Sequence, residues 1–329
     1  MKYNTFRTVV DIPEPEKRIS YHTPCMLFGS CFTENIGQKL ERLKFPVTVN
    51  PFGVLYNPLS IQYSLDILIN KTTFAENNLF YHDGLWHSFS HHSDFSSPDK
   101  NVCLETINNN ISAAAESLMR SSFVFITLGT ARVYILRSTR QVVSNCHKLP
   151  EAAFERKLLS VSEIVDALRE VILRLRAGNT GCSFIMTVSP IRHWKDGAAG
   201  NQLSKSILLV AIHELIGSLP GLYYFPSYEI VMDDLRDYRF YDRDMIHLNT
   251  TATEYIWEKF SSAWISDDSL PIMKEMEKLV QARMHVPFRP GSPQYRVFLD
   301  EQLRRVSDLE EKYPFLDLTR EKEYFSRNR

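Results

Sequence analysis

Residues 24–43 read PCMLFGSCFTENIGQKLERL, an apolar run that continues directly into a helical pattern. The run PCMLFGS (24–30) shows no alternation of polar and apolar residues, which is typical of a strand buried on both faces of a sheet. After it, Ile36, Leu40 and Leu43 recur at helical spacing. A buried strand that leads at once into a helix is the first half of a βαβ unit, so the sequence predicts a parallel sheet.

The same alternation recurs along the chain. Further apolar runs occupy residues 45–50, 121–129, 183–190 and 221–227. Helical patterns separate them, and Ser160 with Glu163 forms a capping box at the start of one helix. We therefore predict a three-layer α/β/α sandwich of the flavodoxin-like type around a five-stranded parallel sheet.

Two insertions and a change of composition complete the predicted organisation. Residues 71–101 and 130–150 interrupt the alternation and are expected to form β-ribbons. After Ser266 the chain changes to long charged helices. We predict one sandwich domain over residues 1–265 and a helical C-terminal extension over residues 266–329 that packs on it.

Composition excludes several classes of partner. The 329 residues include 38 Lys plus Arg and 39 Asp plus Glu, a net charge of −1, which argues against nucleic acids and membranes as partners. There is no apolar run of the length that secretion or a membrane span requires. Five scattered cysteines without CxxC pairs argue against a disulfide framework. We expect a cytoplasmic protein with reduced thiols, and the oligomeric state stays open.

The turn after the first strand contains a candidate nucleophile. Ligands of parallel α/β sheets bind at the carboxyl ends of the strands, and FGSCFTENIG brings Cys31 to such an end and to the start of a helix. The helix dipole is expected to lower the pKa of a thiol there. The alternative is that a small Ser-Cys pair simply fits a tight corner between strand and helix.

The segment YDRDMIHLN (241–249) supplies a base and a residue to orient it. Asp244 precedes His247 by three residues, just before the last helix of the sandwich. The pair follows the fifth predicted strand, so it is expected at the same edge of the sheet as Cys31.

Several motifs together resemble one family. They are FGSCFTENIG, NPFGVLYNP, TLGTARVY, SNCHK, TVSPIRHWKDG and LRDYRFYDRDMIHLN. From about residue 20 to residue 265 the chain resembles the GSCFA family, a distant relative of the GDSL or SGNH hydrolases, which are esterases with a serine nucleophile. When the GDSLT block of these hydrolases is aligned with Gly29–Thr33, Cys31 takes the position of the nucleophilic serine. An alignment shifted by one residue would make Ser30 the nucleophile instead.

The resemblance also implies an oxyanion hole, with one departure. In the SGNH hydrolases a glycine of the second sequence block contributes to the oxyanion hole. Gly53 matches this glycine, and its backbone N–H would point at the developing oxyanion. Where the relatives have a block-three asparagine, this chain has Thr130, so a hydroxyl from Thr130 or an amide from Asn145 would have to replace it. Leu248 follows the histidine where the relatives often have proline.

Other polar residues allow two interpretations each. Arg192 and His193 follow the fourth strand and could bind a carboxylate or phosphate of the substrate, or Arg192 could pair with the acidic residues Asp233, Asp234 and Asp237. Lys205 could contact substrate, but a solvated helix charge is the favoured interpretation.

The histidine-rich ribbon raises the question of a metal. The spacing of His82, His87, His91 and His92 fits no known zinc motif, so we predict no metal site. His147, beside Cys146, could be an alternative base for a thiol, but a hydrogen-bonded ribbon residue is the favoured interpretation.

These observations predict a hydrolase, either esterase or thioesterase, or an acyltransferase that acts on a small-molecule or glycan ester. Cys31 or Ser30 would attack, His247 would carry the proton and Asp244 would orient the imidazole, with no cofactor. The alternative is a non-catalytic module on the same fold that binds a carbohydrate or an acyl group.

Overall fold

Five parallel strands form the central sheet of the computed structural model, which describes residues 8–327. They are β1 (Cys25–Gly29), β2 (Val47–Val49), β5 (Phe123–Leu128), β9 (Ser183–Val188) and β10 (Leu222–Tyr224), in the order β10-β9-β5-β1-β2. The prediction of a five-stranded flavodoxin-like sheet is confirmed. In this order β2 lies on one side of β1, and β5, the next strand of the sheet along the chain, lies on the other side. The carboxyl ends of β1 and β5 therefore flank a topological switch point, where ligands bind in such sheets.

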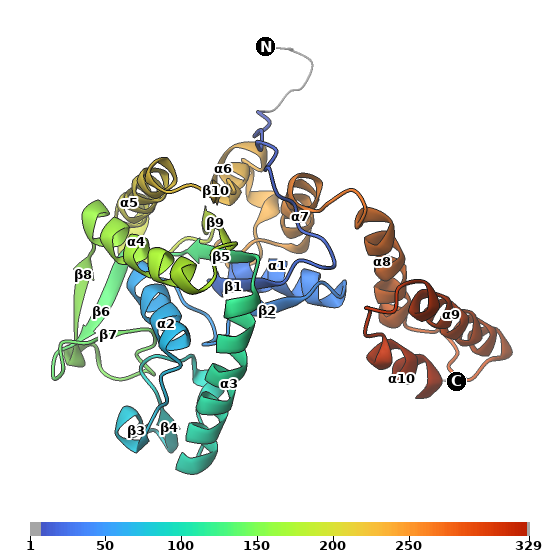
Figure 1. The fold of residues 1–329 in the computed structure, drawn as a ribbon, viewed down its shortest axis with the longest axis horizontal. Coiled ribbons are helices and arrows are strands. Elements are labelled where there is room, and N and C mark those ends of the chain that lie inside the picture. The colour runs from blue at the N-terminus through green and yellow to red at the C-terminus, as the bar shows by residue number, and fades with distance from the viewer. Residues whose placement is uncertain (1–7, 328–329) are drawn as a thin grey trace.

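Helices cover both faces of this sheet (Figure 1). α1 (Cys31–Arg42) and α7 (Thr250–Trp264) cover one face, where Leu27 and Phe125 are buried. The other face carries α2 (Pro58–Asn70), α3 (Lys100–Arg120), α4 (Val161–Gly178) and α5 (Gly197–Ser218). Met26, Val124 and Ile126 are buried there, so alternate residues of one strand enter the two apolar layers of the predicted sandwich.

Both predicted ribbons are present. β3 (Phe80–His82) and β4 (Leu85–His87) form a hairpin whose turn, Asp83–Gly84, has positive φ at both residues, as a two-residue hairpin turn requires. The second ribbon has three strands in the order β7-β6-β8: β6 (Arg132–Leu136), β7 (Val142–Val143) and β8 (Phe154–Leu158). It extends past the predicted end at residue 150 because β8 returns to pair with β6 along its whole length.

Short helical turns connect the main elements. They are η1 (Glu76–Asn78), η2 (Ser93–Phe95), η3 (Glu151–Ala153), η4 (Trp194–Asp196), α6 (Ser227–Glu229), the π-helical η5 (Ile230–Asp234) and η6 (Tyr238–Phe240). Between residues 8 and 327, no helix combines the length and the apolar character needed to cross a membrane.

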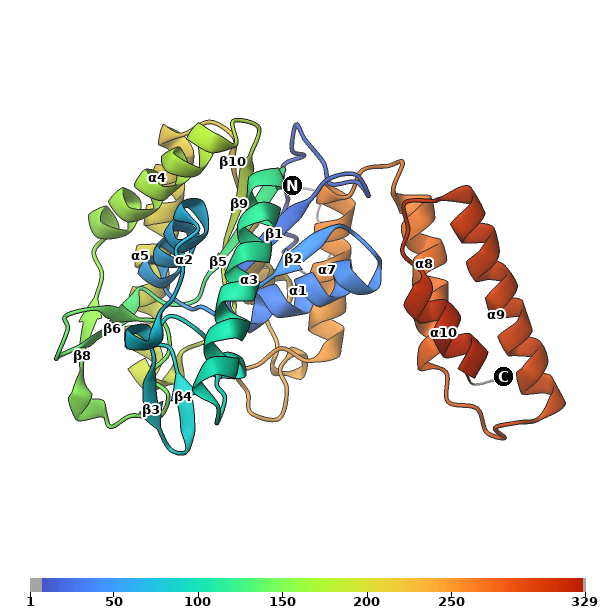
Figure 2. The same cartoon turned by 60° about the horizontal axis from the view of Figure 1, so that its bottom comes forward.

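Three C-terminal helices lie beside the sandwich: α8 (Leu270–Met284), α9 (Pro293–Lys312) and α10 (Thr319–Arg327) (Figure 2). They meet the sandwich next to α1. There Lys44 Nζ lies 2.8 Å from the buried carboxylate of Glu321, and the ring of Phe315 packs against Tyr21 and His22. Residues 1–7 and 328–329, which belong to the predicted domain ranges, lie outside the described residues.

Candidate active site

Cys31 is the first residue of α1 and lies at the switch point between β1 and β5. The approach of the two strands requires glycine at position 29, because a Cβ there would come within 2.5 Å of the Thr127 carbonyl oxygen. Ser30 caps the helix: it is 3 % exposed, and its hydroxyl accepts a hydrogen bond from the Phe32 N–H at 3.4 Å. Cys31 itself is half-buried.

Burial controls the acidity of this thiol. It raises the pKa of Cys31, and the charge of Glu34 adds to the rise. A contact with the Tyr56 hydroxyl, 4.0 Å from Sγ, acts in the opposite direction and is weaker than the burial. The prediction that the helix dipole lowers this pKa is therefore wrong, because the cost of burying a thiolate is larger. Cys31 is a neutral thiol at neutral pH and needs a base to become a nucleophile.

Asp244 and His247 form a hydrogen-bonded pair in the loop before α7. Asp244 Oδ2 lies 2.5 Å from His247 Nδ1, and Oδ1 accepts the N–H groups of Ile246 and His247, each at 2.9 Å. These bonds, led by the one from the imidazole, lower the pKa of Asp244 to about 2. The carboxylate thus fixes Nδ1 and leaves Nε2 as the nitrogen that can exchange a proton.

α1 and α7 bring the two parts of the predicted triad to one edge of the sheet. Both helices lie on the same face, and Lys39 Nζ of α1 lies 2.5 Å from Glu254 Oε1 of α7. Both begin at the carboxyl ends of the strands, so their N-termini point the same way. Within residues 8–327, no hydrogen bond joins Cys31 to the Asp244–His247 pair, and their direct contact stays a prediction.

The predicted oxyanion donors are engaged elsewhere. The Gly53 N–H donates to the Asn50 carbonyl at 2.7 Å. The Thr130 hydroxyl lies 3.1 Å from the Ser204 hydroxyl and accepts the Arg132 N–H. Gly53 and Thr130 therefore hold loops in this structure, contrary to the expectation that their donors face a substrate.

Asn145 is the third predicted donor, and the structure places it in the ribbon. Its Oδ1 accepts the His147 N–H at 2.8 Å. Asn50 was not predicted as a site residue. Its Oδ1 accepts the Gly29 N–H at 2.9 Å, and its buried Nδ2 has no partner among the described residues. Asn50 follows β2 and carries an amide donor next to the Cys31 turn.

His193 and Lys205 lie beneath the rim of the site. His193 packs edge-on against Tyr56, at 5.4 Å between ring centroids, and burial lowers its pKa to about 4, so it is neutral. Lys205 is fully buried, and its Nζ donates to the carbonyls of Gly129 (2.7 Å) and Ser189 (2.6 Å). The prediction of a solvated Lys205 is wrong. Burial, together with the charge of Arg192, lowers its pKa to about 7.

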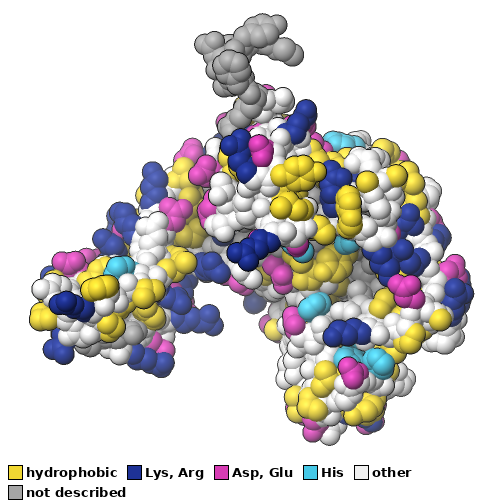
Figure 3. Space-filling model, turned by 180° about the vertical axis from the view of Figure 1, so that it is seen from behind, with side chains coloured by type: hydrophobic (Ala, Val, Ile, Leu, Met, Phe, Trp, Pro, Cys, Tyr) yellow, Lys and Arg dark blue, Asp and Glu magenta, His cyan; other side chains and the backbone are white. Residues whose placement is uncertain are grey.

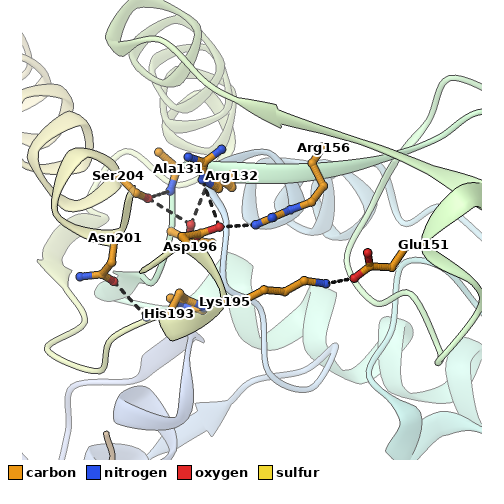
Figure 4. A network of polar contacts seen from close by, with 10 residues as sticks. Ala131, Arg132, Glu151, Arg156, His193, Lys195, Asp196, Asn201 and Ser204 are labelled. Atoms are coloured by element: carbon orange, nitrogen blue, oxygen red, sulfur yellow. Dashed lines mark hydrogen bonds and ion pairs between the residues drawn. The ribbon is translucent and has the colours of Figure 1, made fainter. Parts of the chain in front are cut away.

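A polar network fixes the loop that follows β9 (Figure 4). Asp196 forms ion pairs with Arg132 (3.2 Å) and Arg156 from the second ribbon. The His193 N–H donates to Asn201 Oδ1 at the start of α5. The loop is thereby held between the ribbon and α5, which fixes the backbone around Arg192.

A cavity of about 520 Å³ lies beside the Asp244–His247 loop. It is lined by Arg192, Trp194, Val231, Met232, Arg236, Asp237, Tyr238, Tyr241, Asp244, Met245 and Ile246. The alternative prediction that Arg192 pairs with the nearby acidic residues is wrong. Asp233 pairs with Arg236, Asp234 with Lys259 and Asp237 with Arg239.

A second histidine–aspartate pair was missed. His92 Nδ1 lies 2.9 Å from Asp94 Oδ2, and the ring packs over Gly53. The charges of His92 and Asp94 both act on Glu34, the neighbour of Cys31. Figure 3 shows the hollow between the main body and the lobe that carries β3 and β4, with histidine side chains at its edge.

Hydrogen bonds hold the rings of three further ribbon histidines. His87 Nδ1 bonds to the Ser96 hydroxyl, His91 Nδ1 to the Ser88 hydroxyl, and His147 Nε2 to the Ser88 carbonyl. Among the residues that the structure describes, no group of three or more potential ligands could hold a metal ion.

The sequence model of the GSCFA family matches residues 24–260, and the model described as GSCFA domain protein, C-terminal domain, matches residues 276–328. No curated protein matches the chain.

Proposed function

The chain belongs to the GSCFA family, and we propose that it is an SGNH-like ester hydrolase or acyltransferase with Cys31 as the nucleophile. The observation that carries the proposal is the Asp244–His247 pair, because its geometry leaves the imidazole with one nitrogen fixed and one available. Cys31 lies at the start of a helix on the same face and at the same edge of the sheet.

The reaction has two halves. His247 Nε2 takes the thiol proton while Cys31 Sγ bonds to the carbonyl carbon of an ester or thioester. The tetrahedral intermediate collapses to a thioester on Cys31, and the leaving group departs with the proton from His247. Water then attacks in a hydrolase, or an acceptor hydroxyl or amine in a transferase, and His247 takes its proton. Cys31 leaves as the thiolate and recovers the proton from His247.

Cys31 is a better candidate than Ser30. The Ser30 hydroxyl is buried and acts as the helix cap, so an attack from it would cost the cap. The neutral state of Cys31 fits a mechanism in which the base acts during the attack. No metal or cofactor takes part in these steps.

The compartment is proposed from the cysteines. All five are free thiols, which supports a reducing environment such as the cytoplasm. The substrate would be a small-molecule or glycan ester.

A binding module for a carbohydrate or an acyl group is the second candidate. Two observations favour it: the raised pKa of Cys31, and the engaged donors of Gly53 and Thr130. Such a module would bind the same ligand without turning it over.

Steady-state kinetics on short 4-nitrophenyl esters and acyl thioesters tests the proposal. We expect turnover by the wild type, and a loss of roughly 10³-fold or more in Cys31→Ala and in His247→Ala. Cys146→Ala, which removes another half-buried thiol, is the matched control and should keep full activity. Unchanged turnover in the Cys31 and His247 variants would overturn the proposal.

A further inference from the structure

The cavity beside the Asp244–His247 loop has one charged side chain without a counter-charge. Four charged residues line it: Arg192, Arg236, Asp237 and Asp244. Arg236 pairs with Asp233, Asp237 with Arg239 and Asp244 with His247. Within residues 8–327, Arg192 forms no ion pair; its guanidinium donates to the Met232 sulfur at 3.5 Å and also contacts the Tyr241 hydroxyl. Both partners are neutral, so the remaining N–H groups of the guanidinium keep their capacity to bind an anion.

A buried lysine interacts electrostatically with Arg192. Lys205 is fully buried, and its Nζ donates to two carbonyl oxygens, Gly129 O and Ser189 O. Burial, together with the charge of Arg192, lowers the pKa of Lys205 to about 7, so Lys205 is only partly charged at neutral pH. An anion bound to Arg192 would favour the charged form of Lys205, which would add to the positive potential at this end of the cavity.

The walls of the cavity are apolar and exposed. Trp194, Tyr238 and Met245 are 56 %, 76 % and 55 % exposed, and all three line this one cavity. Large apolar side chains gathered around a few polar groups are typical of a ligand site. They would contact an apolar or planar part of the ligand next to its anionic group.

We propose that this cavity binds an anionic substrate, whose carboxylate or phosphate group is held by the Arg192 guanidinium between the Trp194 and Tyr238 side chains. That the bound anion is a substrate rests on the proposed function. Asp244, Met245 and Ile246 form one wall of the cavity, so an ester attached to the bound anion lies next to the loop of His247.

Calorimetric titration of the full chain tests this inference without turnover. The probes are benzoate, phenyl phosphate and benzamide, which is a neutral analogue of benzoate with nearly the same shape. We expect saturable binding of at least one of the two anions and clearly weaker binding of benzamide. The preferred anion tells a carboxylate ligand from a phosphate ligand.

Three variants test whether anion binding depends on the Arg192 guanidinium. Arg192→Gln should weaken anion binding by about tenfold or more, the value of a charge-assisted hydrogen bond. Arg192→Lys keeps the positive charge but lacks the paired N–H donors of the guanidinium, so it should lose less anion affinity than Arg192→Gln. Thermal melts must show that both variants are folded. Arg169→Gln is the matched control, because it also removes one arginine charge but lies on α4, outside the lining of the cavity, and it should bind as the wild type does.

Three results would overturn the inference: no saturable binding of either anion, equal binding of benzamide and benzoate, or equal binding by Arg192→Gln and the wild type. A protein that binds the anions but hydrolyses no ester would contradict the proposed function and leave the anion site standing.

Discussion

Asp244 Oδ2 lies 2.5 Å from His247 Nδ1, and the same carboxylate also accepts two backbone N–H groups of its own loop. These three bonds fix the carboxylate, and the carboxylate fixes the tautomer of the imidazole.

The first prediction follows from this contact. Asp244→Asn should lower kcat by roughly 10³- to 10⁴-fold, because an amide in that place lets the imidazole adopt the wrong tautomer. Since the pair is exposed, the melting temperature should change little. Steady-state kinetics and a thermal melt measure both effects. A variant with wild-type kcat would show that Asp244 does not orient the base.

The second prediction concerns the acidity of Cys31. Its pKa is raised above 9.0, so the rate of alkylation by iodoacetamide should still be rising at pH 9. Tyr56→Phe removes the side-chain contact that lowers this pKa and should shift the profile further to high pH. Mass spectrometry of the Cys31 peptide follows the reaction. A rate that levels off below pH 8 would contradict the burial argument and favour the helix dipole.

The third prediction concerns Lys205 and stability. Its pKa is lowered from 10.5 to about 7 in the folded state, so between these values the unfolded chain binds more protons. The lysine therefore destabilises the fold fully below about pH 7, and this penalty disappears as the pH rises.

The measurement is the difference in the free energy of unfolding between the wild type and Lys205→Met, followed from pH 6 upward in urea. As the pH rises, the free energy of unfolding of the wild type should increase relative to that of Lys205→Met, by a total on the order of 4 kcal/mol. Taking the difference removes the contributions of the other groups that titrate at high pH. A constant difference would mean that Lys205 stays charged in the folded protein.

The fourth prediction separates the two histidine–aspartate pairs. If His247 is the base, His92→Ala should lower kcat by less than about tenfold, whereas His247→Ala should lower it by roughly 10³-fold or more. The two substitutions remove the same side chain, so they are controls for each other. The reverse order of effects would assign the base to His92, which is paired with Asp94.

Much of the fold could be predicted because its signals are local. The apolar runs of β1, β5 and β9 mark buried parallel strands, and the helical patterns between them mark the covering helices. α10 lies within the predicted helical extension, but its bounds were not predicted, because most of TREKEYFSR is charged and only Glu321 and Phe325 are buried. Glu321 pairs with Arg283 of α8 and with Lys44, which is far away in the sequence.

The candidate site was predictable only where neighbours in sequence are neighbours in space. Asp244 and His247 are three residues apart, and their contact was expected. The burial of Lys205 could not be predicted, because NQLSKS has the pattern of an exposed helix face. Lys205 is buried because α5 packs beneath the ends of β5 and β9. Tyr56 was missed for the same reason, since its contacts with Cys31 and His193 join separate segments.

The proposed roles of Cys31 as nucleophile and His247 as base can be tested by trapping the acyl-enzyme. The wild type, Cys31→Ala and His247→Ala are mixed with 4-nitrophenyl acetate, quenched in acid within one turnover and analysed by intact-protein and peptide mass spectrometry. We expect an acetyl group on Cys31 in the wild type, none in Cys31→Ala, and strongly slowed labelling in His247→Ala. An unlabelled Cys31, or one labelled equally fast without His247, would contradict the proposed roles.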